Sequence, residues 1–173
     1  MSLGIDPIFE RNVFLLRQKI LTIGDKYDIM DQDGNIIGKA KAKFLSLGSK
    51  ITVFDNSDRE VLRIDGNFMR TKFDVIGQNG TNVCVIRRPL VTIRPSLEVE
   101  DSGGQTMLKG SGDFTRHDFS LKDKKNTTVV EVHEKWLSIT DSYAAELTGE
   151  VDPRIALSFV LAVDQAYKKR RRR

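Results

Sequence analysis

The sequence predicts a mainly β protein, in which a closed antiparallel barrel of about twelve strands encloses an apolar C-terminal helix. Two observations predict this fold. A weak repeat of hairpin-like units runs through most of the chain, and the segment near its end reads as a helix that is apolar on nearly every side. We expect a single domain over residues 1–173, with the barrel and its helix in 9–167 and a basic tail in 168–173.

Each hairpin-like unit is a short run with apolar residues at alternate positions, an Asp or Gly anchor, a polar turn and a second apolar run. The anchors, spaced 24, 22, 24 and 22 residues apart, are Asp31, Asp55, Gly77, Asp101 and Asp123. A weaker sixth unit begins with Trp136-Leu137-Ser138-Ile139 and ends at Leu147. Asp, Asn and Gly suit such turns because they tolerate positive φ or bond their own backbone. Six hairpins make about twelve strands, and a long meander loses its open edges by closing.

The predicted helix has a clear start and an apolar body. Asp152 suits the N-cap and Pro153 the first helical position, ahead of a segment that ends at Tyr167. Between Ile155 and Val163 only Ser158 is polar, so the helix must be surrounded by protein or lipid. Its length of about 22 Å is too short for a bilayer but suits the bore of a barrel. A helix packed outside a β-sandwich is the alternative.

Composition favours a water-soluble protein in a reducing, cytoplasmic setting. The chain is 39% hydrophobic and 30% charged, and its single cysteine, Cys84, excludes an intramolecular disulfide and a multi-cysteine zinc site. Charged residues interrupt the first 25 positions, which predicts no signal peptide, and no apolar run is long enough for a transmembrane span. The net charge of +4 comes from the tail, since without it 22 basic residues face 24 acidic ones.

No motif in the sequence points to an enzyme, a cofactor or a metal site. The segment 31–35 (Asp-Gln-Asp-Gly-Asn) resembles the start of a calcium loop, but its glycine stands at position 4 rather than 6 and Ala42 occupies position 12. A hairpin turn explains it fully. Of the two histidines, His133 is expected on the outer face of a strand and His117 just before a strand. Cys84 lies in an apolar strand, where a buried thiol is ordinary.

Two basic segments are candidate binding surfaces. Alternation places Lys39, Lys41 and Lys43 on one strand face and the small Ala40 and Ala42 on the other, toward the helix. The lysine row attracts anionic phospholipid or merely keeps a strand face soluble. The second candidate is the tail, composed of Lys168, Lys169, Arg170, Arg171, Arg172 and Arg173. Such a charge run either complements the dipole at the helix C-terminus as an ordinary disordered tail or binds anionic lipid or nucleic acid. Apart from Tyr167 it lacks the aromatic residues that single-strand binding prefers.

The hairpin repeat, the segment 143–147 (Tyr-Ala-Ala-Glu-Leu) and the terminal Ala156-Leu157…Val160-Leu161-Ala162-Val163-Asp164 resemble the LURP-one-related family. That family is similar in fold to the tubby C-terminal domain and to phospholipid scramblases, which implies a twelve-stranded barrel around a C-terminal helix. The resemblance implies little about activity: tubby domains bind phosphoinositides, scramblases act at membranes with calcium, and LURP-one relatives mostly lack a defined activity. This sequence has no Asp-rich calcium segment before its last helix, and its basic tail matches no motif of the family.

The leading hypothesis is therefore a non-enzymatic cytoplasmic barrel that associates weakly with anionic phospholipid at a membrane surface. Two alternatives belong to other classes. One is a scaffold that binds a protein partner and no small ligand. The other is association with nucleic acid through the tail.

Overall fold

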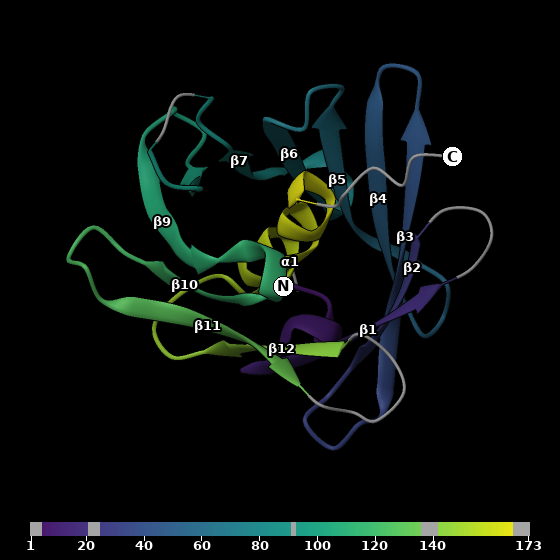
Figure 1. Ribbon diagram of the computed structural model, residues 1–173. Coiled ribbons are helices and arrows are strands. Elements are labelled where there is room, and N and C mark those ends of the chain that lie inside the picture. Colours follow the sequence, from purple (N-terminus) through teal and green to yellow (C-terminus); the bar gives the residue numbers. More distant parts are fainter. Residues whose placement is uncertain (1–4, 21–24, 91–92, 136–141, 168–173) are drawn as a thin grey trace.

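The computed structural model describes residues 5–20, 25–90, 93–135 and 142–167. Within them, twelve antiparallel strands close into one barrel around the helix α1 (Pro153–Tyr167), as Figure 1 shows. The strands are β1 (Val13–Ile20), β2 (Asp25–Met30), β3 (Ile36–Leu45), β4 (Gly48–Asp55), β5 (Glu60–Asn67), β6 (Lys72–Gly77), β7 (Asn82–Arg87), β8 (Leu97–Glu100), β9 (Thr106–Asp113), β10 (Asp118–Lys122), β11 (Thr128–Lys135) and β12 (Ser142–Leu147). Three short 3₁₀ helices are η1 (Pro7–Phe9), η2 (Gln78–Gly80) and η3 (Phe114–Arg116). The predicted fold class is confirmed.

The predicted anchors form one recurring turn. At Asp31, the carboxylate Oδ1 accepts hydrogen bonds from the backbone N–H groups two and four residues later, and the residue three positions later has positive φ. The same bonds occur at Asp55, Asp101 and Asp123. Gly77 keeps the backbone part of the turn without a side-chain acceptor. The segment 31–35 is thus a hairpin turn whose first carboxylate is occupied by its own backbone.

The barrel closes where β1 pairs with β12, with Phe14 opposite Ala145 and Leu16 opposite Tyr143. All other neighbours in the barrel are consecutive in sequence. Of the sixth predicted unit, the second run is found as β12, whereas residues 136–139 lie outside the described residues. β1 was not predicted as a strand because it does not alternate: Leu15, which points away from the bore, is buried with Met30 and Ala144 in a small second cluster.

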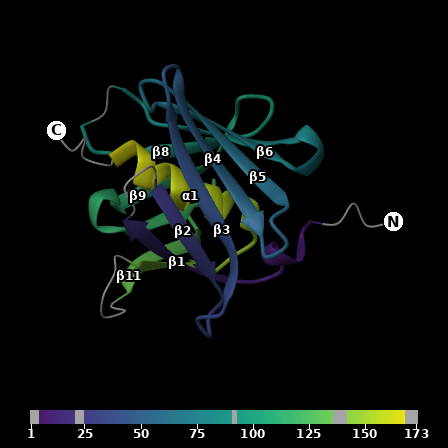
Figure 2. The ribbon, with the colours of Figure 1, turned by 90° about the vertical axis from the view of Figure 1, so that its right-hand side faces the viewer.

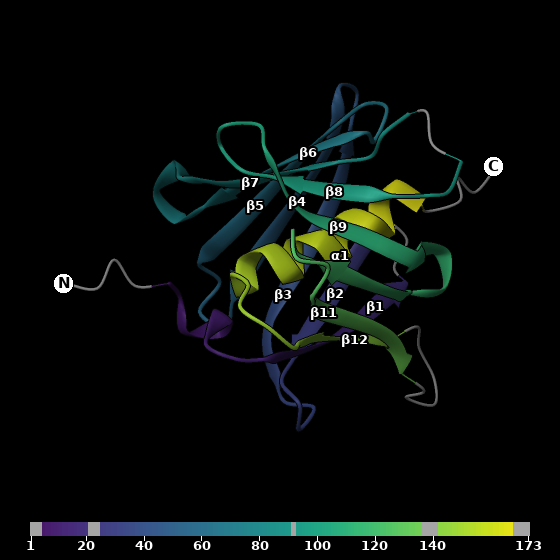
Figure 3. The same ribbon diagram turned by 90° about the vertical axis from the view of Figure 1, so that its left-hand side faces the viewer.

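Helix α1 lies in the bore and is enclosed on every side (Figures 2 and 3). All residues from Ile155 to Ala166 are buried, and Leu157, Phe159 and Leu161 have no exposed surface. The carboxylate of Asp152 accepts the Arg154 N–H at 2.9 Å, as an N-cap should. The barrel wall makes room for the helix with small residues. Those facing it include Ala40, Ala42 and Gly110. The exterior-helix alternative is therefore wrong.

The two open ends of the barrel differ. One end, here called the acidic-turn rim, carries the turns anchored at Asp31, Asp55, Asp101 and Asp123, and η1 packs nearby, where Arg59 contacts Asp6. The other end, here called the helix-end rim, carries the β3–β4, β5–β6, β7–β8 and β9–β10 connections and the C-terminus of α1 (Figure 2).

Candidate functional site

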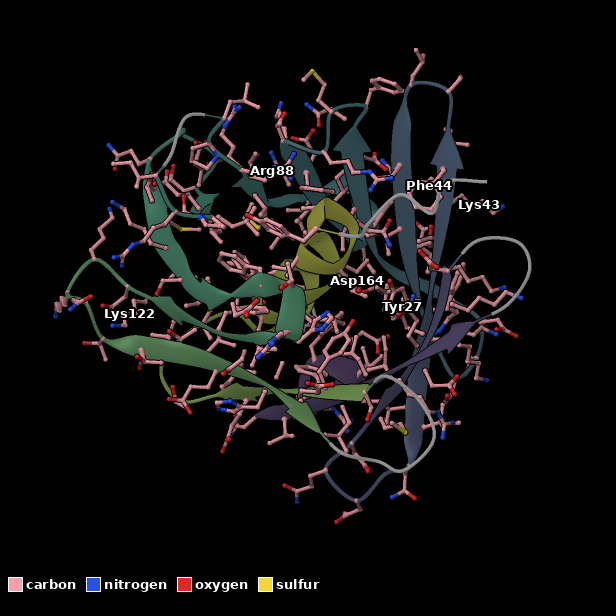
Figure 4. The ribbon with its side chains drawn as sticks, in the orientation of Figure 1. Tyr27, Lys43, Phe44, Arg88, Lys122 and Asp164 are labelled. Carbon is pink, nitrogen blue, oxygen red and sulfur yellow. The ribbon has the colours of Figure 1, made fainter. Side chains whose placement is uncertain are left out.

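Two arginines hold the C-terminus of α1 at the helix-end rim. The last carbonyls of a helix have no partner within it, and cations are favoured beside them. Arg70, from the β5–β6 turn, donates to the carbonyl of Gln165 at 3.1 Å, and Arg88, after β7, donates to that of Ala166 at 2.9 Å. Arg70 adopts a left-handed backbone (φ 56°), which the Asn67 turn imposes by accepting the N–H groups of Thr71 and Lys72. Figure 4 shows Arg88 at this end of the barrel.

The same arginines tie the neighbouring loops together. The Arg70 guanidinium lies 5.2 Å from the ring centre of Phe44, at the end of β3. Arg88 also donates to the carbonyl of Met69 at 3.3 Å and stacks over Tyr167, the last residue of α1. The β3–β4, β5–β6 and β7–β8 loops and the end of the helix therefore form one connected unit.

Exposed apolar side chains gather on these three loops. Among the described residues nine large apolar side chains are exposed, and seven of them belong to the set here called the tip residues. The tip residues are Phe44, Leu45, Leu47, Phe68, Met69, Leu90 and Ile93. Leu47 is 88% exposed and Ile93 fully exposed. An apolar cluster of this kind on a protein surface indicates an interaction site.

The loops that carry the tip residues are also basic. The segments 43–50, 67–72 and 87–96 contain no Asp or Glu, and their seven basic residues are Lys43, Lys50, Arg70, Lys72, Arg87, Arg88 and Arg94. The turns of the acidic-turn rim have the opposite balance. Their acidic residues are Asp31, Asp33, Asp55, Asp58, Glu60, Asp101 and Asp123, against the basic Arg59, Lys124 and Lys125. The three loops that carry the tip residues are thus basic and these turns are acidic, whereas the β9–β10 connection, at the same end as the three loops, carries the exposed Asp113 and Asp118.

The predicted lysine row divides between these environments. Ala40 and Ala42 face the bore and the lysines face outward, as expected. Lys39, nearest the acidic-turn rim, forms an ion pair with Asp58, and Lys41 lies 5.4 Å from the ring centre of Phe54. Lys43 is exposed beside Phe44 at the helix-end rim and stands opposite Lys50 on β4. The six tail residues 168–173 lie outside the described residues and follow directly on Tyr167.

A buried polar cluster lies inside the same rim (Figure 4). The hydroxyl of Tyr27, on β2, donates to the carboxylate of Asp164 on α1. The side-chain amide of Gln165 donates to the Tyr27 hydroxyl and to Asp25, both at 3.2 Å. Burial, together with the neighbouring Tyr143 and Asp164, raises the pKa of Tyr27 well above its ordinary value. Tyr27 therefore stays a neutral donor, which allows Asp164 to be buried as a hydrogen-bonded carboxylate.

His117 joins this cluster from the β9–β10 turn. Its Nε2 lies 3.4 Å from Asp164 Oδ1, and its ring stacks on Tyr143 with centroids 4.1 Å apart. Beside it is a hollow of about 280 Å³. The hollow is lined by Gln18, Thr115, Arg116, His117, Glu134, Ser142, Tyr143 and Asp164. Asp164 accepts a hydrogen bond from Tyr27 and lies beside the ring of His117, so the cluster brings the β9–β10 turn and β2 together at the end of the helix.

The other candidate residues from the sequence lie apart from the tip residues and from the buried polar cluster. Cys84 is buried, and burial raises the pKa of its thiol to about 12, so it is a protonated core residue. His133 is exposed on β11 within 3.5 Å of Glu131 and Asp118. Among the described residues no three His, Cys, Asp or Glu side chains are grouped so as to hold a metal ion. In the same part of the chain, no helix has the length and apolarity needed to cross a membrane.

Sequence reasoning missed the tip residues and the polar cluster. The tip residues were readable as apolar residues within turns, for example Leu45-Ser46-Leu47-Gly48, where turns are ordinarily polar. The cluster had a weaker signal. It lay in Asp164 and Gln165, two polar residues in a helix that the barrel had to enclose.

A closed barrel of twelve strands whose bore is filled by its own C-terminal helix defines the structural class of this protein. The model of the LURP-one-related family matches residues 12–164, and the chain belongs to that family, as its sequence resemblance implied. The X-ray structure of a protein from Arabidopsis thaliana is similar, with a TM-score of 0.69 over 97% of this chain and all of the other. At 16% sequence identity this likeness shows the fold alone. No curated protein matches the sequence.

Proposed function

We propose that this protein is a non-enzymatic, cytoplasmic barrel that associates with anionic phospholipid surfaces through its helix-end rim. The observation that supports the proposal most is the difference in charge between the three loops that carry the tip residues and the turns at the opposite end of the barrel. The basic rim loops lack acidic residues, and the acidic turns lie at the other end. Such a distribution orients the barrel toward a negative surface even when its net charge is small. The similarity in fold of the LURP-one-related family to tubby domains, which bind phosphoinositides, and to scramblases, which act at membranes, favours the same ligand class.

The contacts at the rim favour a weak attraction over a strong one. Arg70 and Arg88 are occupied by the helix end, while Lys72 pairs with Asp74 and Arg87 with Glu100. Among the described residues, Lys43, Lys50 and Arg94 then remain as cations of these loops without an ion pair, and Lys50 stands opposite Asp65 on β5. Each basic residue near an anionic bilayer contributes about 1 kcal/mol, so these three supply about 3 kcal/mol. The six tail residues add to it where they reach the surface.

A vesicle-binding assay with charge-reversal variants tests the proposal. We expect the protein to bind vesicles that contain phosphatidylserine and not vesicles of phosphatidylcholine, with binding that weakens as salt rises. The double variant Lys43→Glu/Lys50→Glu should bind at least about tenfold more weakly, since it reverses two charges facing the membrane. The control Lys124→Glu/Lys125→Glu makes the same change in net charge at the acidic-turn rim and should bind normally.

Three outcomes contradict the proposal in different ways. Equal, negligible binding to both kinds of vesicle rejects lipid association and favours a protein scaffold. Equal losses in the two charge variants mean that net charge, and not the rim, is responsible. Binding that disappears when residues 168–173 are removed, and that DNA competes away, assigns the attraction to the tail and leaves nucleic acid as the ligand.

A further inference from the structure

We infer that the tip residues insert into the interfacial layer of the bilayer, so that the barrel stands on the membrane with the C-terminus of α1 facing it. The inference rests on the proposed function and goes further, because charge alone holds a protein at the surface without any insertion. It assigns to the three rim loops the apolar part of a two-part contact.

The distribution of exposed apolar side chains carries the inference. Seven of the nine that are exposed among the described residues lie on three loops at one end of the barrel. The loops are separate in sequence but neighbours in the barrel, since β3 through β8 pair in order. The remaining two, Ile5 and Ile36, lie outside these loops and are single. Scattered exposed apolar residues are normal on any protein, whereas a cluster on adjacent loop tips needs a partner.

Parts of the β3–β4 and β5–β6 loops are also held in position before any partner binds. Arg70 joins the Phe44 ring to the carbonyl of Gln165, and Arg88 joins the carbonyls of Met69 and Ala166. Because both arginines are anchored on the end of α1, which is itself enclosed by the barrel, the Phe44 ring and the backbone at Met69 are fixed to the most buried element of the protein. Little conformational freedom is then lost when they enter a membrane, which favours binding.

Charge decides between a membrane and an apolar protein groove as the partner. The tip residues share their loops with seven basic residues and no acidic one. In an anionic bilayer, negative headgroups lie directly above an apolar layer. Tip residues that enter the apolar layer therefore leave the basic residues behind them among the headgroups. Lys43, for example, precedes Phe44 in the chain and is one strand position further from the tip.

Depth-dependent quenching tests insertion directly. Cys84 is buried, so a single new cysteine takes up an environment-sensitive fluorophore selectively. With the label at Leu47→Cys, phosphatidylserine vesicles should shift its emission to the blue, and lipids brominated on the acyl chain should quench it. With the label at Gln32→Cys, on the acidic-turn rim, neither change is expected. The variant Leu47→Ser/Leu90→Ser should bind about tenfold more weakly, whereas Ile5→Ser/Ile36→Ser, a matched pair of changes outside these loops, should bind normally.

The outcomes separate this inference from the proposed function. If the protein binds anionic vesicles, but the label at residue 47 is not quenched and Leu47→Ser/Leu90→Ser binds as tightly as the native chain, insertion is wrong and electrostatic association stands. If the native chain binds no vesicle, both are wrong. Quenching at residue 47 without quenching at residue 32 supports insertion with the helix-end rim facing the bilayer.

Discussion

Replacing Gly110 by alanine is the sharpest test of how the helix fits its barrel. A Cβ atom built on Gly110 would lie 2.6 Å from Cζ of Phe159, far inside van der Waals contact. The Phe159 ring has no exposed surface and also packs on Phe119, with ring centroids 5.7 Å apart, so it has little room to move. Overpacking of this kind costs about 1–3 kcal/mol. For a domain of this size that lowers the melting temperature by about 2–4 °C per kcal/mol.

A second substitution separates the clash from a general effect on the strand. Phe159→Leu shortens the side chain and removes the ring edge that a methyl group at Gly110 would strike. We expect the double variant Gly110→Ala/Phe159→Leu to be more stable than the sum of the single effects allows, by about 1 kcal/mol or more. Chemical denaturation of the four proteins, compared by midpoint and slope, measures this coupling. Strictly additive losses would refute the placement of Phe159 against β9, and with it this register of helix and barrel.

Three further predictions concern single groups. Cys84 should react with a thiol reagent only when the protein unfolds. Because the pKa of Cys84 is raised from 9.0 to about 12, its contribution to stability is present below pH 9 and is lost as the pH rises toward 12. The fall in melting temperature over this pH range should be smaller in Cys84→Ala. The carboxylate of Asp55 accepts the Arg59 N–H, which lowers the pKa of Asp55, so stability should fall as the pH drops below about 4. Stability should fall less steeply with pH in Asp55→Asn, and the same pH dependence in both proteins would contradict the hydrogen-bonded turn. Tyr27→Phe removes the donor to buried Asp164 and should cost about 1–3 kcal/mol in denaturation, whereas no loss would mean that the carboxylate is satisfied otherwise.

The parts of the fold that were predictable are those governed by local chemistry. The Asp anchors mark a turn that depends on the residue's own backbone bonds, so Asp55 and Asp101 locate their hairpins without knowledge of the rest. Helix α1 was predictable for a related reason, since a segment that is apolar all round has to be enclosed. β1 was not, because Leu15 is buried on the outer side of the barrel by neighbours that are distant in sequence.

The candidate site was harder to predict because it exists only once the barrel has closed. The direction of Lys41 and Lys43 followed from strand alternation, but their difference in environment depends on cross-strand partners such as Phe54 and Lys50. Arg70 and Arg88 meet the end of α1 across 95 and 78 residues of chain. No local pattern reports such contacts, so the polarised rim appears in the sequence only as scattered basic and apolar turn residues.

Whether the barrel itself associates with anionic phospholipid is decided by the binding of the chain without residues 168–173 to anionic and to neutral vesicles. Removal of the tail leaves 22 basic and 24 acidic residues, so net charge no longer favours a negative surface. The rim loops with Lys43 and Arg94 remain, so we expect weak, salt-sensitive binding to phosphatidylserine vesicles and none to phosphatidylcholine vesicles. Loss of all preference for the anionic vesicles would contradict it, because the barrel itself would then have no part in membrane association.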